Sequence, residues 1–271
     1  MKLIFDIGGT KTRLGLSPDG STISTVVEMD TLPDPQKNLA AMSGEIKKMA
    51  GRDKISVGCG GVAGVLDANK SGLLKSPNLT GWENFPLKKN IEKITGVRVY
   101  LVNDAAMEGL GEATMGAGRR KQTVAYLSIG TGIGGVKIHD GKICPAAAGF
   151  EPGHQIIDWG GKAGYLEHFA SGRAMEKIFN RKPEEIDEPE IWEKETRLLA
   201  IGIHNAIVFW SPEMVILGGG LMQKIDLEYL KNLIREELII FPVLPEIVRS
   251  ELGEKSGLYG ALAYLKTVSD F

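Results

Sequence analysis

Short apolar segments alternate with amphipathic ones along this chain, and both halves open in the same way, with a strand, a tight turn and a second strand. The first half predicts strands at residues 3–7, 12–17, 22–28, 55–59 and 97–102, and helices at 35–50, 87–94 and 104–115. The second half predicts strands at 123–129, 132–139 and 214–217, and helices at 167–179, 189–210, 226–238 and 257–268. This order, stated twice, is typical of duplicated α/β domains.

The clearest break in composition is Gly116-Ala117-Gly118, which is followed by three basic residues. We therefore expect an N-terminal α/β domain at residues 1–116 and a C-terminal α/β domain at 117–256. The C-terminal helix, within residues 257–271, is expected to complete the first domain. Two further segments, 60–81 and 146–164, are rich in glycine and predict irregular structure.

Charge and cysteine content narrow the function classes. The chain has 271 residues with 32 basic and 34 acidic side chains, so it lacks the positive field of a nucleic-acid binder. Cys59 and Cys144 are far apart and predict neither a disulfide framework nor a cysteine metal site, which fits a reducing cytoplasm. No apolar run approaches the roughly 20 residues that span a bilayer, and Met1-Lys2 enters a strand, so neither a membrane span nor a leader is expected.

Two turns rich in glycine and threonine are candidates for phosphate binding, at residues 6–12 and 130–135. Glycine lets backbone N–H groups come close to phosphate oxygens. Between the turns, Asp104 follows an apolar strand, at the kind of position where loops of α/β proteins meet ligands. The pair predicts a polyphosphate site that acts on a hydroxyl group. Taken singly, the second turn could be only a hairpin that needs positive φ, and Asp104 only a helix N-cap.

Neither turn is a known nucleotide fingerprint. No Gly-Lys-Ser/Thr follows either of them, as a Walker loop requires. A second strand follows each turn at once, whereas a dinucleotide fingerprint leads into a helix.

Three more segments follow the first turn in a fixed order: Asn103-Asp104-Ala105, Glu151-Pro152-Gly153-His154 and Leu217-Gly218-Gly219-Gly220. The whole series resembles the ROK family of sugar kinases and sugar-responsive repressors, over nearly the entire chain. The resemblance implies an α/β fold of two actin-like (ribonuclease H-like) domains flanking a cleft. ROK repressors carry a DNA-binding helix-turn-helix ahead of this body. Because Leu3 already belongs to the first strand, we expect the kinase branch.

The resemblance also implies roles for individual residues. Asp104 would be the general base, and Asp6 would hold Mg²⁺ through water. The residues implied to bind ATP are Gly8, Gly9, Thr10, Lys11, Thr131, Gly132, Gly134, Gly135, Gly218 and Gly219. The residues implied to bind the sugar are Asn78, Asn103, Asp104, Glu151, His154 and Glu167. Taken alone, Asp6 could be a buried turn residue, Lys11 a surface lysine, and the two glutamates solvated carboxylates.

One departure from the family concerns zinc. The family carries a cysteine-rich run after its Gly-His pair that, with the histidine, holds a structural zinc. Here the corresponding run is Asp158 to Glu167 and contains no cysteine, so no zinc is predicted. We expect Trp159 and Tyr165 to hold this loop by packing. The role of His154, which could bind sugar or be structural, stays open at this point.

The sequence thus predicts a cytoplasmic kinase that uses ATP and Mg²⁺ to phosphorylate a hexose, glucose first, on its terminal hydroxyl. Fructose or an N-acetylhexosamine is the alternative substrate, and polyphosphate the alternative donor. An inactive sugar-sensing regulatory protein is the alternative from another class, ahead of a heat-shock-type ATPase. Homodimers are common among proteins of this kind, which is an analogy only.

Overall fold

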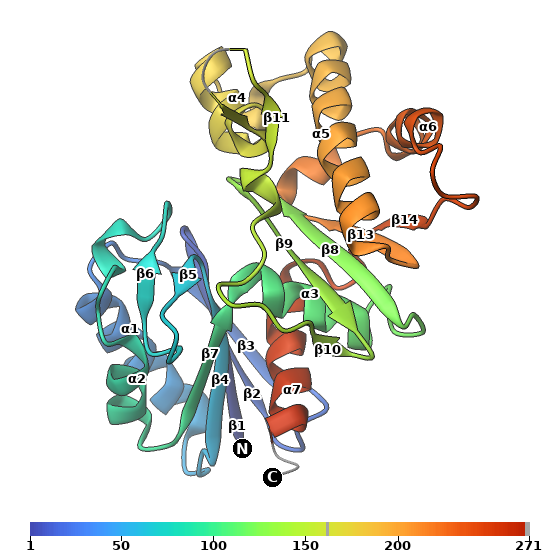
Figure 1. Ribbon diagram of the computed structural model, residues 1–271. Coiled ribbons are helices and arrows are strands. Elements are labelled where there is room, and N and C mark those ends of the chain that lie inside the picture. Colours follow the sequence, from blue (N-terminus) through green and yellow to red (C-terminus); the bar gives the residue numbers. More distant parts are fainter. Residues whose placement is uncertain (161–162, 269–271) are drawn as a thin grey trace. The chain divides into compact units, whose positions relative to one another are not determined.

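The computed structural model describes residues 1–160 and 163–268, and it confirms the predicted α/β class (Figure 1). The chain divides into two compact units. Unit 1 comprises Met1–Met115, Pro145–Gly149 and the C-terminal segment from Glu254, and unit 2 comprises Gly116–Cys144 and Phe150–Gly253. Within the described residues, no helix is long and apolar enough to cross a membrane.

Unit 1 is built on a five-stranded sheet in the order β3-β2-β1-β4-β7. Strand β1 pairs antiparallel with β2, while β1, β4 and β7 run parallel. The strands of unit 1, including β5 and β6 outside this sheet, are β1 (Lys2–Ile7), β2 (Lys11–Ser17), β3 (Thr25–Asp30), β4 (Val57–Val62), β5 (Val65–Leu66), β6 (Leu73–Lys75) and β7 (Val99–Asn103). Its helices are α1 (Pro35–Ala50), α2 (Leu87–Thr95), α3 (Asp104–Met115) and α7 (Ser256–Val268).

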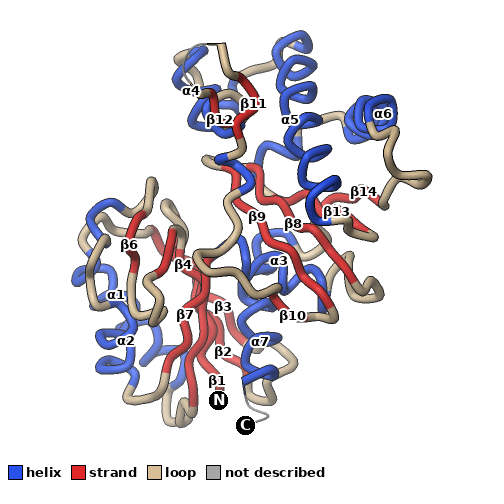
Figure 2. Tube along the Cα trace, viewed as in Figure 1, coloured by secondary structure: helices blue, strands red, loops and turns tan. Residues whose placement is uncertain are grey.

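Side chains of β1 alternate between the two faces of this sheet, as a strand requires. Leu3, Phe5 and Ile7 are fully buried in a cluster that includes Leu39 of α1 and Ile91 of α2. Helices α1 and α2 therefore cover one face, and α3 with α7 covers the other (Figures 1 and 2). Asp6 belongs to the face covered by α3 and α7.

Unit 2 repeats this plan with a sheet in the order β10-β9-β8-β13-β14. Strands β8 and β9 are antiparallel, while β8, β13 and β14 run parallel. Its strands are β8 (Thr123–Ile129), β9 (Ile133–His139), β10 (Lys142–Ile143), β11 (Ile156–Asp158), β12 (Gly164–Tyr165), β13 (Met214–Gly218) and β14 (Glu246–Arg249). Its helices are α4 (Gly172–Phe179), α5 (Pro189–Trp210) and α6 (Leu227–Glu237), and its core lies between the sheet and α5 and α6.

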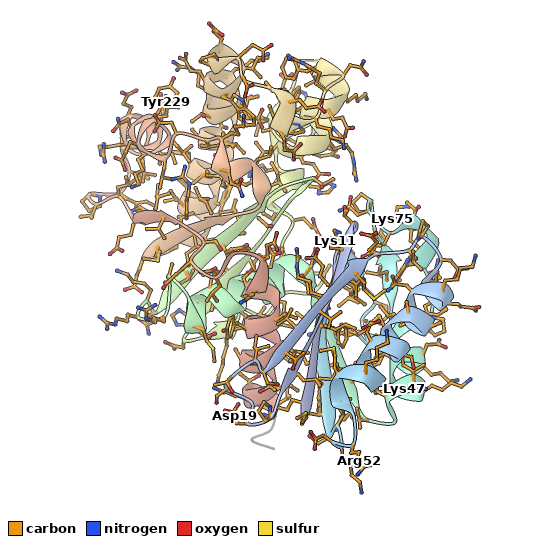
Figure 3. All side chains as sticks on the ribbon, turned by 180° about the vertical axis from the view of Figure 1, so that it is seen from behind. Lys11, Asp19, Lys47, Arg52, Lys75 and Tyr229 are labelled. Carbon is orange, nitrogen blue, oxygen red and sulfur yellow. The ribbon has the colours of Figure 1, made fainter. Side chains whose placement is uncertain are left out.

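Local polar contacts fix several chain reversals. In the turn between β2 and β3, the Asp19 carboxylate accepts hydrogen bonds from the backbone N–H groups of Ser21 and Thr22 (Figure 3). Helix α1 begins after Asp34, whose carboxylate accepts from Gln36 N and Lys37 N. Such side-chain caps satisfy N–H groups that a helix or turn leaves without partners.

Most predicted elements are confirmed, two are corrected, and the short strands β5, β6, β10, β11 and β12 were not predicted. The helix expected at 167–179 begins at Gly172, because Ser171 caps α4 by accepting from Ala174 N, and residues 166–168 form a separate 3-10 turn. The strand expected at 55–59 is β4, which continues through the segment expected to be irregular as far as Val62. A side chain at Gly60 would overlap the ring of Phe5, so glycine is required there inside the strand. Strand β14 was not predicted.

Candidate functional site

The carboxyl ends of three parallel strands bring two predicted site residues together in unit 1. Asp6 of β1 lies opposite Gly61 of β4, and Gly61 lies opposite Val102 of β7, two residues before Asp104. A Cβ on Gly61 would be 3.0 Å from Asp6 Oδ1 and 3.2 Å from Asp104 Cα. The two aspartates therefore lie on either side of a glycine that leaves room for both.

Asp6 is buried and incompletely satisfied. Its side chain is 6% exposed, and among the described residues its Oδ1 atom has no hydrogen-bond partner. Burial raises the pKa of Asp6 well above its usual value, and the charges of Glu108 and Asp104 raise it further, against a smaller opposing effect of Arg13. A buried carboxyl group with an open acceptor suits a cation or a shared proton.

The helix that follows β7 is capped by Asn103 and not by Asp104, which corrects the simple N-cap interpretation. Asn103 Oδ1 accepts from Ala106 N at 3.0 Å, and its Nδ2 donates to Gly64 O at 3.1 Å. Asp104 is the first residue of α3. Burial raises the pKa of Asp104, with hydrogen bonds from the Ala105 and Asp104 N–H groups opposing the shift.

The first glycine turn is exposed at its tip and packs against the loop that carries Asn78, one of the residues implied to bind the sugar. Gly9 and Thr10 are exposed, and a Cβ on Gly9 would be 2.6 Å from the Cβ of Asn78. Ser76 fixes that loop, since its hydroxyl donates to Ala63 O at 2.6 Å and accepts from Leu79 N. Unit 1 thus brings Asn78 beside the phosphate turn.

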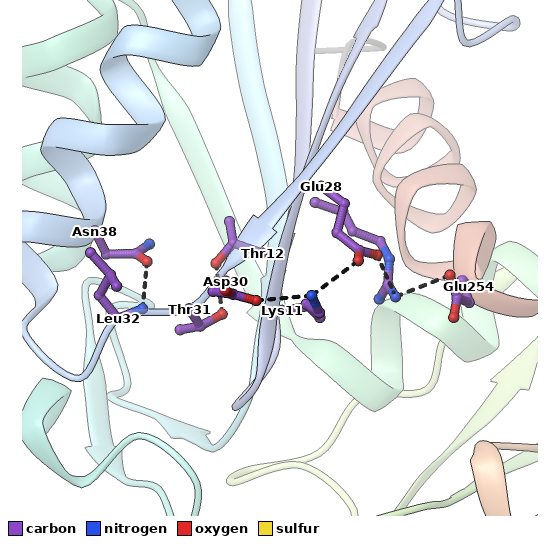
Figure 4. Close-up of polar contacts among 9 residues, drawn as sticks. Lys11, Thr12, Glu28, Asp30, Thr31, Leu32, Asn38 and Glu254 are labelled. Carbon is purple, nitrogen blue, oxygen red and sulfur yellow. Dashed lines mark hydrogen bonds and ion pairs between the residues drawn. The ribbon is translucent and has the colours of Figure 1, made fainter.

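Lys11 points away from this turn toward strand β3 (Figure 4). Its Nζ lies 2.8 Å from Asp30 Oδ1 and 3.5 Å from Glu28 Oε1. The neighbouring Arg13 bridges Glu28 at 2.9 Å and Glu254 at 3.2 Å. A contact between Lys11 and a phosphate would require its side chain to leave two carboxylates, so this role stays a prediction.

In unit 2, the second glycine turn and the Gly218-Gly219 pair lie at the carboxyl ends of the neighbouring strands β8 and β13. Gly218 lies opposite Ser128, two residues before the tip that joins β8 to β9. Gly219 has a φ of 90°, and a Cβ there would overlap the backbone of Ile129, so only glycine fits.

Close approach, and not positive φ, explains why Gly135 of the second turn is glycine. Among the described glycines, those of both turns lie outside the set with positive φ. A Cβ on Gly135 would be 2.6 Å from Tyr126 O and 2.8 Å from a carbon of Pro152. The interpretation that the second turn only needs positive φ is therefore wrong. Gly135 is buried by this packing, whereas Thr131 is exposed.

Three predicted sugar-binding residues gather beside this turn in unit 2. His154 ends the 3-10 turn η2 (Pro152–His154), and its Nδ1 lies 3.5 Å from Glu151 Oε2. Its Nε2 lies 3.9 Å from Glu167 Oε1, and Glu167 Oε2 accepts from Ile133 N at 3.3 Å. Glu167 thus links the Glu151–His154 turn to the first residue of β9. The predicted sugar residues are divided, with Asn78, Asn103 and Asp104 in unit 1 and Glu151, His154 and Glu167 in unit 2.

The run that lacks the family cysteines forms a short hairpin of β11 and β12. The prediction that Trp159 packs this loop is wrong, because its side chain is 72% exposed. Tyr165 does pack, since the centroid of its ring lies 5.5 Å from the ring centroid of His154 and 5.1 Å from that of His168. Gly161 and Lys162, which belong to the same run, lie outside the described residues.

Comparison with known proteins decides the family. The model of the ROK family matches residues 3–268 of the chain. The chain belongs to the ROK family. A glucokinase of Thermotoga maritima is 28% identical over 98% of both chains, and a xylose repressor of Caldicellulosiruptor bescii is 28% identical over 80% of this chain and 64% of the repressor. The crystal structure of a ROK hexokinase from Thermus thermophilus superposes with a TM-score of 0.85, at 29% identity and 99% coverage of each chain.

The fold is thus the actin-like α/β fold of ROK sugar kinases, as expected. Within this ROK protein, two features near the site were not predicted from the sequence. Glu108 lies one helical turn after Asp104 and is the strongest charge acting on Asp6. Gly257 of α7 lies on another side of Asp6, since a Cβ there would be 3.1 Å from Asp6 Cγ. The four-residue spacing from Asp104 was a usable signal for Glu108, whereas Gly257 is 251 positions away in the sequence.

Proposed function

We propose that this ROK protein is an ATP-dependent kinase that phosphorylates a hexose on its terminal hydroxyl, with glucose as the first substrate to test. The names of the glucokinase and hexokinase relatives support this proposal. The observation that carries it is the pair of aspartates in unit 1, where Asn103 caps the helix and Asp104 is available for a reacting hydroxyl. A carboxylate near a hydroxyl can act as a general base.

In the proposed reaction, the sugar hydroxyl oxygen bonds to the terminal phosphorus of ATP while the bond from that phosphorus to ADP breaks. The hydroxyl proton passes to the Asp104 carboxylate. Phosphoryl transfer needs mainly positioning and charge stabilisation. The turn around Gly9 and Thr10 and the turn around Thr131 supply exposed backbone for phosphate groups.

Asp6 is the residue that fits Mg²⁺, because its buried Oδ1 has no partner within the described residues. Among those residues, no group of three or more His, Cys, Asp or Glu side chains is arranged to hold a metal ion. Mg²⁺ usually keeps several waters and takes few protein ligands, so one aspartate with substrate phosphates suffices. When bound, the ion would neutralise charge on those phosphates.

The decisive experiment measures formation of the sugar phosphate with a panel of glucose, fructose and N-acetylglucosamine, using ATP or polyphosphate as donor. Asp104→Asn should lower kcat by about 10²–10⁴-fold, the usual contribution of a general base, with glucose Kd within a few-fold of wild type. Asp34→Asn is the matched control, since Asn caps a helix as well as Asp does. Undiminished turnover in Asp104→Asn would refute the assignment.

The pH profile gives an independent check. A base works only when deprotonated, so kcat/KM should fall as the pH drops through the pKa of Asp104 in the free enzyme. Because burial raises that pKa, the acid limb should lie above the ordinary range of an aspartate. A profile flat down to the ordinary range would argue against Asp104 as the base.

The second candidate is a regulatory sugar-binding protein, which the repressor relative favours. It predicts binding of glucose, measured by calorimetry, without formation of a sugar phosphate from any member of the panel with either donor.

A further inference from the structure

Gln155 connects three parts of unit 2, two through its side chain and one through its backbone carbonyl. Its Nε2 donates to Pro152 O at 2.8 Å, within the η2 turn, and to Gly202 O of α5 at 3.2 Å. Its Oε1 accepts from Asn205 Nδ2 of α5 at 2.7 Å. Its backbone carbonyl accepts from Leu166 N, the residue before Glu167, at 2.9 Å.

Helix α5 is shaped to receive this side chain. Gly202 and Asn205 lie three residues apart, so they share one face of the helix. A Cβ on Gly202 would be 3.2 Å from Gln155 Nε2 and would overlap Leu166. The helix therefore offers a small residue with a carbonyl acceptor and, one turn on, an amide donor.

The η2 turn is short, and the backbone hydrogen bonds that close it run from His154 N to Glu151 O and from Gln155 N to Pro152 O. It is a single 3-10 turn without a side-chain cap, and Pro152 has no N–H group to donate. Glu151 and His154 are exposed, with side chains 42% and 50% accessible, so their positions depend on the turn that carries them and, for His154, on the ring contact with Tyr165. The turn is held from below by Gly153, which abuts Ile133, and from the side by Gln155.

We propose that Gln155, braced by Asn205, is a positioning residue that holds Glu151 and His154 in the geometry that binds the sugar hydroxyls. This inference rests on the proposed function. Gln155 touches no substrate and acts through the turn. Hydrogen bonds to sugar hydroxyls depend on direction and distance, so a loosened turn weakens sugar binding without altering the nucleotide contacts.

The test compares Gln155→Ala, Asn205→Ala and the double variant with wild type. Each single variant should raise the KM for glucose about tenfold, with the KM for ATP within about twofold. The double variant should resemble Gln155→Ala, because Asn205 acts on the turn through the Gln155 side chain. Asn232→Ala is the matched control. Asn232 is exposed on α6, and its side-chain oxygen accepts a hydrogen bond from the exposed side chain of Arg235.

A further variant separates the two kinds of bond. Gln155→Glu keeps an acceptor for Asn205 but cannot donate to the carbonyls of Pro152 and Gly202, so it should raise the glucose KM as Gln155→Ala does. Wild-type behaviour of Gln155→Glu would overturn the proposal. So would an unchanged glucose KM in Gln155→Ala and Asn205→Ala.

A purely structural role predicts a lower urea midpoint with no change in glucose KM measured well below it. Hydrogen exchange at the His154 and Gln155 amides, which bond to Glu151 O and Pro152 O, should accelerate in the variants. If wild type transfers phosphate to none of the sugars, the proposed function fails. If wild type is active and the variants match it, this inference fails alone.

Discussion

A polar side chain is available for chemistry only if the fold does not already use it. The Asn103 side chain accepts a hydrogen bond from Ala106 N at the start of α3 and donates one to Gly64 O. Its neighbour Asp104 therefore does not have to cap the helix. Asp6 is buried, yet its Oδ1 atom has no hydrogen-bond partner in residues 1–160 and 163–268. Natural proteins satisfy most buried polar atoms, so this exception marks a place where a ligand can contribute.

Glu195 is a second buried carboxyl group, and its Oε1 atom has no hydrogen-bond partner within the part of the chain that the structure describes. It lies on the face of α5 that carries Trp192 and Leu199. Burial raises the pKa of Glu195 to about 8, from 4.5. The folded protein then keeps a proton that the unfolded chain releases, so stability should fall as the pH rises from about 4.5 to 8.

Glu195→Gln has the same size without the charge and should remove this loss. At pH 8 the variant should be several kcal/mol more stable than wild type, at about 1.4 kcal/mol per unit of pKa shift, and at pH 4.5 nearly equal. Urea unfolding at both values measures the difference. Glu190→Gln, exposed on the same helix, is the control, and parallel curves for wild type and Glu195→Gln would contradict the prediction.

At the scale of elements, α3 and α7 approach each other through glycines. A Cβ on Gly260 would overlap Met107 O, and one on Gly111 would overlap Ser256 O. Gly260→Ala should therefore destabilise the protein by about 1–3 kcal/mol, although alanine is the better helix former. Gly44→Ala in α1 meets no atom within 4 Å and should stabilise by about 0.5–1 kcal/mol. Urea midpoints of the two variants should move in opposite directions, and a shift of both in one direction would refute the helix-contact argument.

The elements that the sequence predicted best are those with local signals. Helices 35–50 and 189–210 were predicted with their observed bounds, because each begins at a proline and has the apolar spacing of a helix. The predicted strand ended before β4 does, because Gly60 and Gly61 suggest a loop. The atoms that require glycine at these positions belong to β1 and α3, which the local sequence does not reveal.

In the candidate site too, residues with a local sequence pattern could be predicted, and residues that depend on distant partners could not. The glycine turns and the aspartate after β7 have local patterns and could be found. Gln155 could not, because its partner Asn205 is 50 residues away and only the fold brings them together. For Trp159, the sequence predicted packing that the structure does not show, because an aromatic residue in a loop can remain exposed.

At the scale of the molecule, the chain makes one unit almost from a continuous segment and the other from separate segments. Residues 116–253 contain all five strands of the unit 2 sheet with α4, α5 and α6. Unit 1 needs α7 from the C-terminal segment, where Leu258, Leu262 and Leu265 are fully buried. We therefore propose 1–115 with the segment from 254, and 116–253, as the two folding domains.

Fragments test this division. The fragment 116–253 should unfold cooperatively in urea, because it carries its own core. The fragment 1–115 should not, since losing α7 uncovers one face of its sheet together with the apolar face of α3. Joining 1–115 to 254–271 through a flexible Gly/Ser linker should restore a cooperative transition, measured by circular dichroism at 222 nm. The division would be refuted if 1–115 alone unfolded as sharply as the linked protein, because α7 would then contribute nothing that the first domain needs.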